Sequence, residues 1–129
     1  PFLQAVHNTF TIVPLVVGEA TAEEVSEVLK LLWGGDETLI VISSDLSHYH
    51  DYHTAQQMDR TTSNAIEQLR PEALNYDDAC GRHPVSGLLL LAKQKGLHAT
   101  TADLRNSGDT AGSKDQVVGY GAYVFELQH

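Results

Sequence analysis

The chain has 129 residues, of which 42% are hydrophobic and 19% charged, so its size and composition fit one ordinary globular domain. Its 17 acidic side chains outnumber 8 basic ones, and the net charge of -9 would repel nucleic acid and anionic lipid. No apolar stretch approaches the ~18 residues of a transmembrane helix. We therefore expect neither nucleic acid nor a membrane as a partner. The single cysteine, Cys80, cannot form an internal disulfide and fits a reducing, cytoplasmic location.

The N-terminal third predicts two strands around one helix. Residues Thr9–Val17 alternate and then run apolar, as in a strand buried on both faces. Thr21 and Glu24 form a possible capping box, and apolar residues then recur at helical spacing until Gly34. Residues Thr38–Ser43 are almost continuously apolar, which is typical of a central strand in a largely parallel sheet.

Two further helices follow in the middle of the chain. Apolar residues from Ala55 to Leu69 share a helical face, and Pro71 ends that helix because the residue before a proline is forced out of the helical region. A second helix is predicted from about Pro84, with Gly96 as its C-terminal cap.

The C-terminal third predicts two strands, Ala99–Leu104 and Val117–Leu127, joined by an irregular polar loop over Arg105–Asp115. The alternation of strands and helices predicts an α/β fold with a central, mostly parallel or mixed sheet flanked by helices.

The first candidate site is the polar run Ser43–His50, directly after a predicted strand, where ligands bind in open α/β sheets. Asp45 and His48 are three residues apart, so on a helical turn their side chains share a direction, and an aspartate can fix the tautomer of an imidazole. The alternative is that Asp45 caps a turn and His48 is an ordinary exposed histidine. His50 and His53 are either further metal ligands or exposed histidines.

The second candidate site is Cys80, which precedes a predicted helix N-terminus and has Arg82 and His83 nearby. These features favour a reactive sulfur, either as a nucleophile or as a soft metal ligand. The alternative is a buried cysteine that packs as a small hydrophobe. In the following loop, Arg105 could hold a substrate carboxylate through two hydrogen bonds.

Four separated blocks of the sequence together resemble one family. They are VISSDLSHY (41–49), ACGRHPVSGLL (79–89), DLRNSGDTAG (103–112) and VVGYGAY (117–123). They resemble the Memo family, also called AmmeMemoRadiSam system protein B. That family is similar in turn to the class III extradiol dioxygenases, whose α/β fold it shares.

The resemblance implies roles for particular residues. In the dioxygenases two histidines and a glutamate hold ferrous iron, and in the Memo family a cysteine, here Cys80, stands where the glutamate would be. A thiolate there favours softer ions, including cuprous copper. The family's SSDxxH block places His48 as an acid, a base or a substrate contact, and Asp45 as the residue that orients it. Ser44 and Arg105 are the predicted substrate contacts.

The resemblance also implies that residues 1–129 are a single domain or a C-terminal half-domain. The family is about twice as long, and its two metal-ligating histidines lie in its N-terminal half, so His7, His50 and His53 match no ligand motif. We expect an iron or copper ion in the complete protein and none retained by this chain alone. The expected partners are the N-terminal half or a second copy, together with a small-molecule substrate.

Three functions remain open from the sequence. The first is a metal-dependent redox protein of the dioxygenase type. The second is a non-catalytic adaptor that binds a ligand or peptide in the same pocket. The third is a cysteine hydrolase that pairs Cys80 with His48 or His83, for which no oxyanion loop is identifiable.

Overall fold

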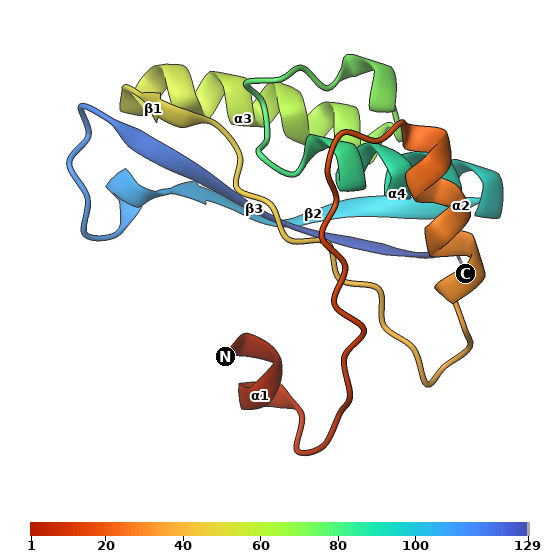
Figure 1. Ribbon diagram of the computed structural model, residues 1–129. Coiled ribbons are helices and arrows are strands. Elements are labelled where there is room, and N and C mark those ends of the chain that lie inside the picture. The colour runs from red at the N-terminus through yellow and green to blue at the C-terminus, as the bar shows by residue number, and fades with distance from the viewer. Residues whose placement is uncertain (129) are drawn as a thin grey trace.

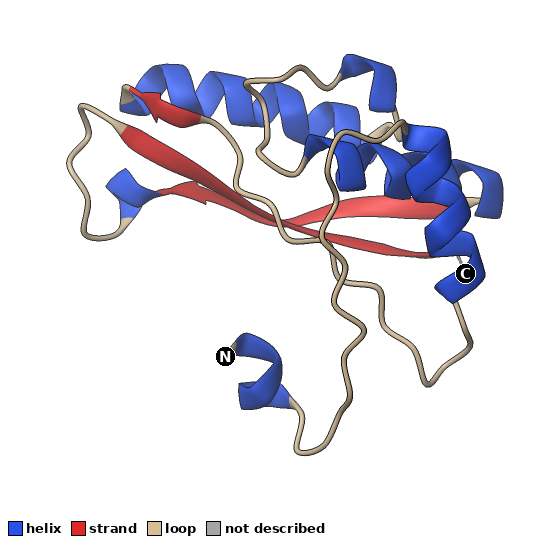
Figure 2. Cartoon of the chain, in the orientation of Figure 1, coloured by secondary structure: helices blue, strands red, loops and turns tan. Residues whose placement is uncertain are grey.

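The computed structural model describes residues 1–128 and places helices against one face of a small antiparallel sheet (Figures 1 and 2). This confirms the predicted α/β class. The elements in chain order are α1 (Phe2–Val6), α2 (Ala22–Leu32), β1 (His48–His50), α3 (Tyr52–Glu67), the 3-10 turn η1 (Pro71–Ala73), α4 (Arg82–Lys95), β2 (Leu97–Asn106), the 3-10 turn η2 (Ser107–Asp109) and β3 (Val117–Leu127).

Local capping explains where the helices begin and end. At α2 the Thr21 hydroxyl accepts from the Glu24 backbone N–H at 3.1 Å, and the Thr21 N–H donates to the Glu24 carboxylate at 2.9 Å, which confirms the predicted capping box. Asp51 caps α3 by accepting two backbone N–H bonds. Helix α4 ends at Gly96, whose φ of 69° favours glycine.

The sheet has the strand order β1-β3-β2, and both pairings are antiparallel. Strands β2 and β3 pair from Leu97↔Leu127 to Asn106↔Gly119, with a register shift between Thr101 and Asp103. Both C-terminal strands were therefore predicted correctly, although β2 runs into the segment expected to be loop. Helix α3 packs on β2 and β3, and the opposite face of the sheet carries no helix in Figure 2.

The two predicted N-terminal strands, Thr9–Val17 and Thr38–Ser43, are not formed, and the described sheet is antiparallel rather than mostly parallel. Both segments run outside the sheet, and in Figure 1 the helix α1 lies away from the layer of the other helices. Val17, Ile40 and Ile42 nevertheless pack against the apolar cluster of α2 and α4. Val16 is fully exposed and Leu39 is 69% exposed. An apolar run predicts burial, but a strand forms only when a neighbouring backbone satisfies its N–H and C=O groups.

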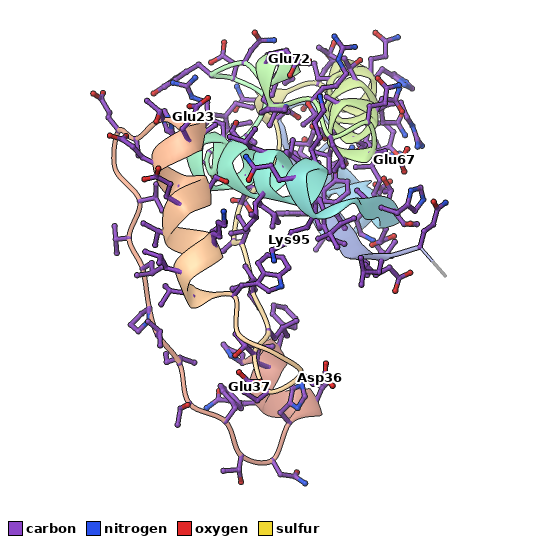
Figure 3. The ribbon with its side chains drawn as sticks, turned by 90° about the vertical axis from the view of Figure 1, so that its right-hand side faces the viewer. Glu23, Asp36, Glu37, Glu67, Glu72 and Lys95 are labelled. Atoms are coloured by element: carbon purple, nitrogen blue, oxygen red, sulfur yellow. The ribbon has the colours of Figure 1, made fainter. Side chains whose placement is uncertain are left out.

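The core consists of two apolar clusters on either side of α4. Buried residues of α2 and α4 form one cluster, and buried residues of α3, α4 and the segment after η1 form the other. Gly87 allows α2 and α4 to approach closely, since a Cβ there would overlap Val25. Figure 3 shows the side chains of Glu23, Glu67 and Glu72 at the surface, and Lys95 lies over the Trp33 ring at 4.7 Å.

None of the helices within residues 1–128 combines the length and the apolarity needed to cross a bilayer.

Candidate functional site

The start of α4 meets the loop that precedes β1, and Cys80 lies at this meeting point. The Cys80 Sγ is 3.2 Å from the Asp45 backbone nitrogen, which donates to it, and 3.7 Å from the Ser44 hydroxyl. The side chain is exposed rather than buried. Cys80 therefore does not pack as a small hydrophobe, which was the alternative from sequence, and its sulfur faces hydrogen-bonding groups at the surface.

These contacts suit both protonation states of the sulfur. As a thiol, Cys80 can accept from the Asp45 N–H while it donates to the Ser44 hydroxyl or to the Asp45 carbonyl, which is 3.9 Å away. As a thiolate, it keeps the Asp45 N–H as a donor.

A close backbone approach fixes the Ser44 hydroxyl beside the sulfur. The Gly81 N–H donates to the Ser44 Oγ at 2.9 Å, and that hydroxyl donates onward to the Asp45 carbonyl at 2.7 Å. A Cβ at Gly81 would lie 2.7 Å from the Ser44 Cβ, well inside ordinary contact distance. The absence of a side chain at position 81 is what lets Ser44 sit at the start of α4.

The predicted Asp45–His48 pair is present. The His48 Nε2 is 3.7 Å from the Asp45 Oδ2, and the two side chains are 33% and 49% exposed. A pair of side chains this exposed contributes little to stability. Because Asp45 also donates its backbone N–H to Cys80, this one residue touches both the thiol and the imidazole.

A buried carboxylate that the sequence analysis missed holds this loop in place. Asp59 of α3 is only 2% exposed and accepts the Ser47 N–H at 3.0 Å. Burial raises the pKa of Asp59, and the Ser47 N–H acts in the opposite direction. A signal was available, since Asp59 follows Ala55 by four residues and so falls on the apolar face of the predicted helix.

Gly119 of β3 completes the attachment of the loop. Its carbonyl accepts the Leu46 N–H at 2.9 Å, and its own N–H donates to the Ser47 carbonyl at 2.8 Å. A Cβ at Gly119 would overlap the Asp59 carboxylate, so only glycine fits between β3 and α3 at this level. The loop is therefore bonded to α3 and to β3 as well as to Cys80.

Arg105, the predicted substrate contact, is engaged elsewhere. Its Nε and an Nη donate to the Asp103 carboxylate at 2.6 and 3.1 Å, and this hydrogen bonding lowers the pKa of Asp103. Its backbone pairs with Tyr120. The structure thus brings Ser44, Asp45, His48 and Cys80 together, while the guanidinium of Arg105 is bound to Asp103 instead.

Within the described residues 1–128 the remaining histidines form no metal centre. Across residues 1–128 no three His, Cys, Asp or Glu side chains are grouped closely enough to hold a metal ion. The His83 Nδ1 lies 2.9 Å from the Ala20 carbonyl and donates to it. That bond directs His83 toward the segment before α2. His48, by contrast, contacts the carboxylate of Asp45, the residue whose backbone N–H donates to Cys80.

The fold and the site define an α/β protein in which a thiol, an imidazole and a carboxylate converge at the start of a helix. Residues 1–124 match the family model described as Memo-like protein. The chain belongs to the Memo-like family, as the four sequence blocks indicated.

Curated relatives support the same membership. A MEMO1 family protein of Methanosarcina mazei is 34% identical over 98% of this chain and 52% of its own length. One from Sulfolobus acidocaldarius is 35% identical over 93% of this chain and 46% of its own length. One from Archaeoglobus fulgidus is 33% identical over 98% of this chain and 52% of its own length. The chain spans about half the length of the curated relatives it matches.

Proposed function

We propose that this chain supplies the thiol, imidazole and carboxylate of a metal-dependent redox centre of the class III extradiol dioxygenase type, with iron or copper as its metal. One observation supports this most strongly. The Asp45 backbone donates to the Cys80 sulfur at 3.2 Å while its carboxylate lies 3.7 Å from the His48 imidazole. A soft ligand and an acid–base group, which come from two separate segments of the chain, thus both lie beside Asp45.

Each residue has a defined part in this proposal. Cys80 is the thiolate ligand, His48 moves a proton to or from a small-molecule substrate, and Asp45 holds His48 in the required orientation. Ser44 and Arg105 contact the substrate, which requires Arg105 to exchange Asp103 for a substrate carboxylate. We place the protein in the cytoplasm as part of the same proposal.

The donor set within residues 1–128 does not by itself fit a resident metal, since no three potential ligands are grouped there. Further ligands would have to come from the part of the family's length that this chain does not match. For the chain alone we therefore expect weak metal binding that depends on Cys80.

Titration of the chain with Co(II) and with Cu(I) tests this expectation. Weak binding with a sulfur-to-metal charge-transfer band is expected in the wild type, and Cys80→Ser should remove it. His48→Ala should change the band, whereas His53→Ala, at an exposed histidine at the start of α3, should leave it unchanged. A band that survives Cys80→Ser, or responds equally to both histidine variants, would contradict the assignment.

The adaptor interpretation makes a different prediction for the same pocket. A family-length protein with tight metal and substrate-dependent oxygen consumption supports redox chemistry. Ligand binding without oxygen consumption supports a non-catalytic adaptor.

A further inference from the structure

Two residues other than glycine have a left-handed backbone within residues 1–128: Tyr49, with a φ of 63°, and Leu69, with a φ of 53°. Leu69 directly follows the C-cap of α3, and its N–H donates to the Ile66 carbonyl at 3.0 Å. The Arg70 N–H donates to the Ala65 carbonyl at 2.9 Å, which completes a turn that commonly ends a helix. Tyr49 ends no helix, so its backbone conformation needs another explanation.

Tyr49 is the extra residue of a β-bulge in β1. His48 lies opposite Val118 and His50 lies opposite Val117, so three residues of β1 span two residues of β3. Where a bulge requires a left-handed residue, glycine is the usual one, because a large side chain strains the backbone there. Bulges of this kind recur beside functional sites, where they redirect a side chain.

Bonds on both sides of Tyr49 impose this conformation. Before it, the Ser47 N–H donates to the Asp59 carboxylate at 3.0 Å, and the Ser47 carbonyl accepts the Gly119 N–H at 2.8 Å. After it, His50 is paired with β3. A strained backbone persists only where its surroundings determine it in this way.

The bulge brings the rings of His48 and Tyr49 to the same side of the chain. In a regular strand, successive side chains point to opposite faces. Here the two ring centroids are 5.7 Å apart and the ring planes lie at 63°, which is an edge-to-face arrangement. The Asp45 carboxylate, at 3.7 Å from the His48 Nε2, is farther than a hydrogen bond and attracts the imidazole without fixing its ring. The aromatic contact supplies the second constraint.

We propose that Tyr49 is a positioning residue, whose strained backbone holds the phenol ring against the His48 imidazole and keeps that imidazole turned toward Asp45. Burial does not explain the ring, since Tyr49 is 71% exposed. Backbone strain retained at an exposed residue is typical of a site where stability is given up for function. The use of this contact rests on the proposed acid–base role of His48, whereas the contact itself can be measured without metal or substrate.

Three substitutions at position 49 separate the ring from the backbone. Tyr49→Phe keeps both the aromatic ring and the strain. Tyr49→Leu keeps the strain and removes the ring, and Tyr49→Gly removes both. Tyr76→Leu is the matched control, because Tyr76 is 78% exposed and its ring lies beside Arg82 rather than beside a histidine.

Nuclear magnetic resonance of the 129-residue chain reports the His48 ring, whose signals are identified by their loss in His48→Ala. Three-bond couplings and nuclear Overhauser effects give the population of the held imidazole orientation relative to the others. This ratio should be the same in the wild type, Tyr49→Phe and Tyr76→Leu. It should fall about two- to tenfold in Tyr49→Leu and Tyr49→Gly, the factor that corresponds to one aromatic pair.

Two further measurements distinguish positioning from a general effect on the fold. Tyr49→Gly should melt at a higher temperature than Tyr49→Leu, because glycine is free of strain at this φ. The rate at which Cys80 reacts with a disulfide reagent should be unchanged in every variant at position 49, since the bulge takes no part in the bond from the Asp45 N–H to the sulfur.

Four results would overturn the proposal. They are an unchanged His48 ratio in Tyr49→Leu, an equal fall in Tyr49→Phe or Tyr76→Leu, a Tyr49→Gly protein that melts no higher than Tyr49→Leu, and a changed Cys80 rate wherever the His48 ratio falls. Failure of the chain to bind Co(II) or Cu(I) would instead contradict the proposed function and would leave these ring measurements as they are.

Discussion

Replacing Gly81 by alanine should destabilise the chain and disturb its only thiol. The new Cβ would lie 2.7 Å from the Ser44 Cβ and 2.9 Å from both the Ser43 carbonyl and the Ser44 Oγ. Ordinary carbon contacts are about 3.5–4.0 Å, so Ser44 must retreat by roughly 1 Å. That movement breaks the 2.9 Å bond between the Gly81 N–H and the Ser44 hydroxyl.

The net cost follows from two opposing effects. Overpacking of this kind costs about 1–3 kcal/mol. The backbone at Gly81 has a φ of -94°, which alanine adopts freely, so the substitution also restricts the unfolded chain and returns about 0.4–1 kcal/mol. We expect a net loss of about 1–2 kcal/mol in the free energy of unfolding.

Urea denaturation followed by circular dichroism measures the stability, and the rate of Cys80 reaction with a disulfide reagent measures the environment of the thiol. Gly18→Ala is the matched control, because a Cβ at Gly18 has no atom within 4 Å. The control should leave the thiol rate unchanged and stability the same or slightly higher. If Gly81→Ala behaves like this control, the close approach of Ser44 to α4 does not hold the site together.

The other predictions concern the buried carboxylate, the core and a helix cap. Burial raises the pKa of Asp59 above 3.8, so the folded state holds this proton more tightly and wild-type stability falls as pH rises between the unfolded and folded pKa values. The free energy of unfolding, measured by urea denaturation, should therefore fall with rising pH in the wild type and fall less in Asp59→Asn across that pH window. If it changes equally with pH in both proteins, the pKa of Asp59 is not raised. Leu89→Ala, at a fully buried residue, should cost about 2–5 kcal/mol by thermal unfolding, and a loss under 1 kcal/mol would mean that α4 does not pack as described. Thr21→Ala should lower the free energy of unfolding by about 1 kcal/mol, because it removes the hydroxyl that caps α2. Thr21→Ser keeps a hydroxyl and should restore most of that loss. If Thr21→Ser is no more stable than Thr21→Ala, the hydroxyl has no part in the cap.

Helices and the C-terminal strand pair were predictable because their signals are local. The capping box at Thr21, the αL cap at Gly96 and the apolar faces of α3 and α4 depend on residues within a few positions of one another. Strands β2 and β3 follow each other in the chain and pair directly, so each finds its partner nearby. The short strand β1 was missed because it is only three residues long.

The segments Thr9–Val17 and Thr38–Ser43 show the limit of such signals. Their apolar runs correctly indicate surfaces that favour burial, yet no pattern in a single sequence states which backbone will pair with them. The same limit applied to the site. The spacing correctly suggested that Asp45 and His48 lie close together, although the structure places them in a loop and at the start of β1 rather than on a helical turn. The attachment of this loop to Asp59 and Gly119 depends on how α3 and β3 pack in three dimensions.

The attachment of the loop before β1 also determines when the thiol acquires its surroundings during folding. Ser47 is bonded to α3, Gly119 joins the loop from a strand near the end of the chain, and Cys80 takes its N–H bond from a residue 35 positions earlier. Contacts between such distant parts of a chain require the intervening loops to close first, which is slow compared with helix formation. The Asp45 N–H therefore reaches Cys80 only once the loop before β1 has docked beside the start of α4. A nascent or partly unfolded chain would present Cys80 as an ordinary surface thiol, without the donor that distinguishes it in the native molecule.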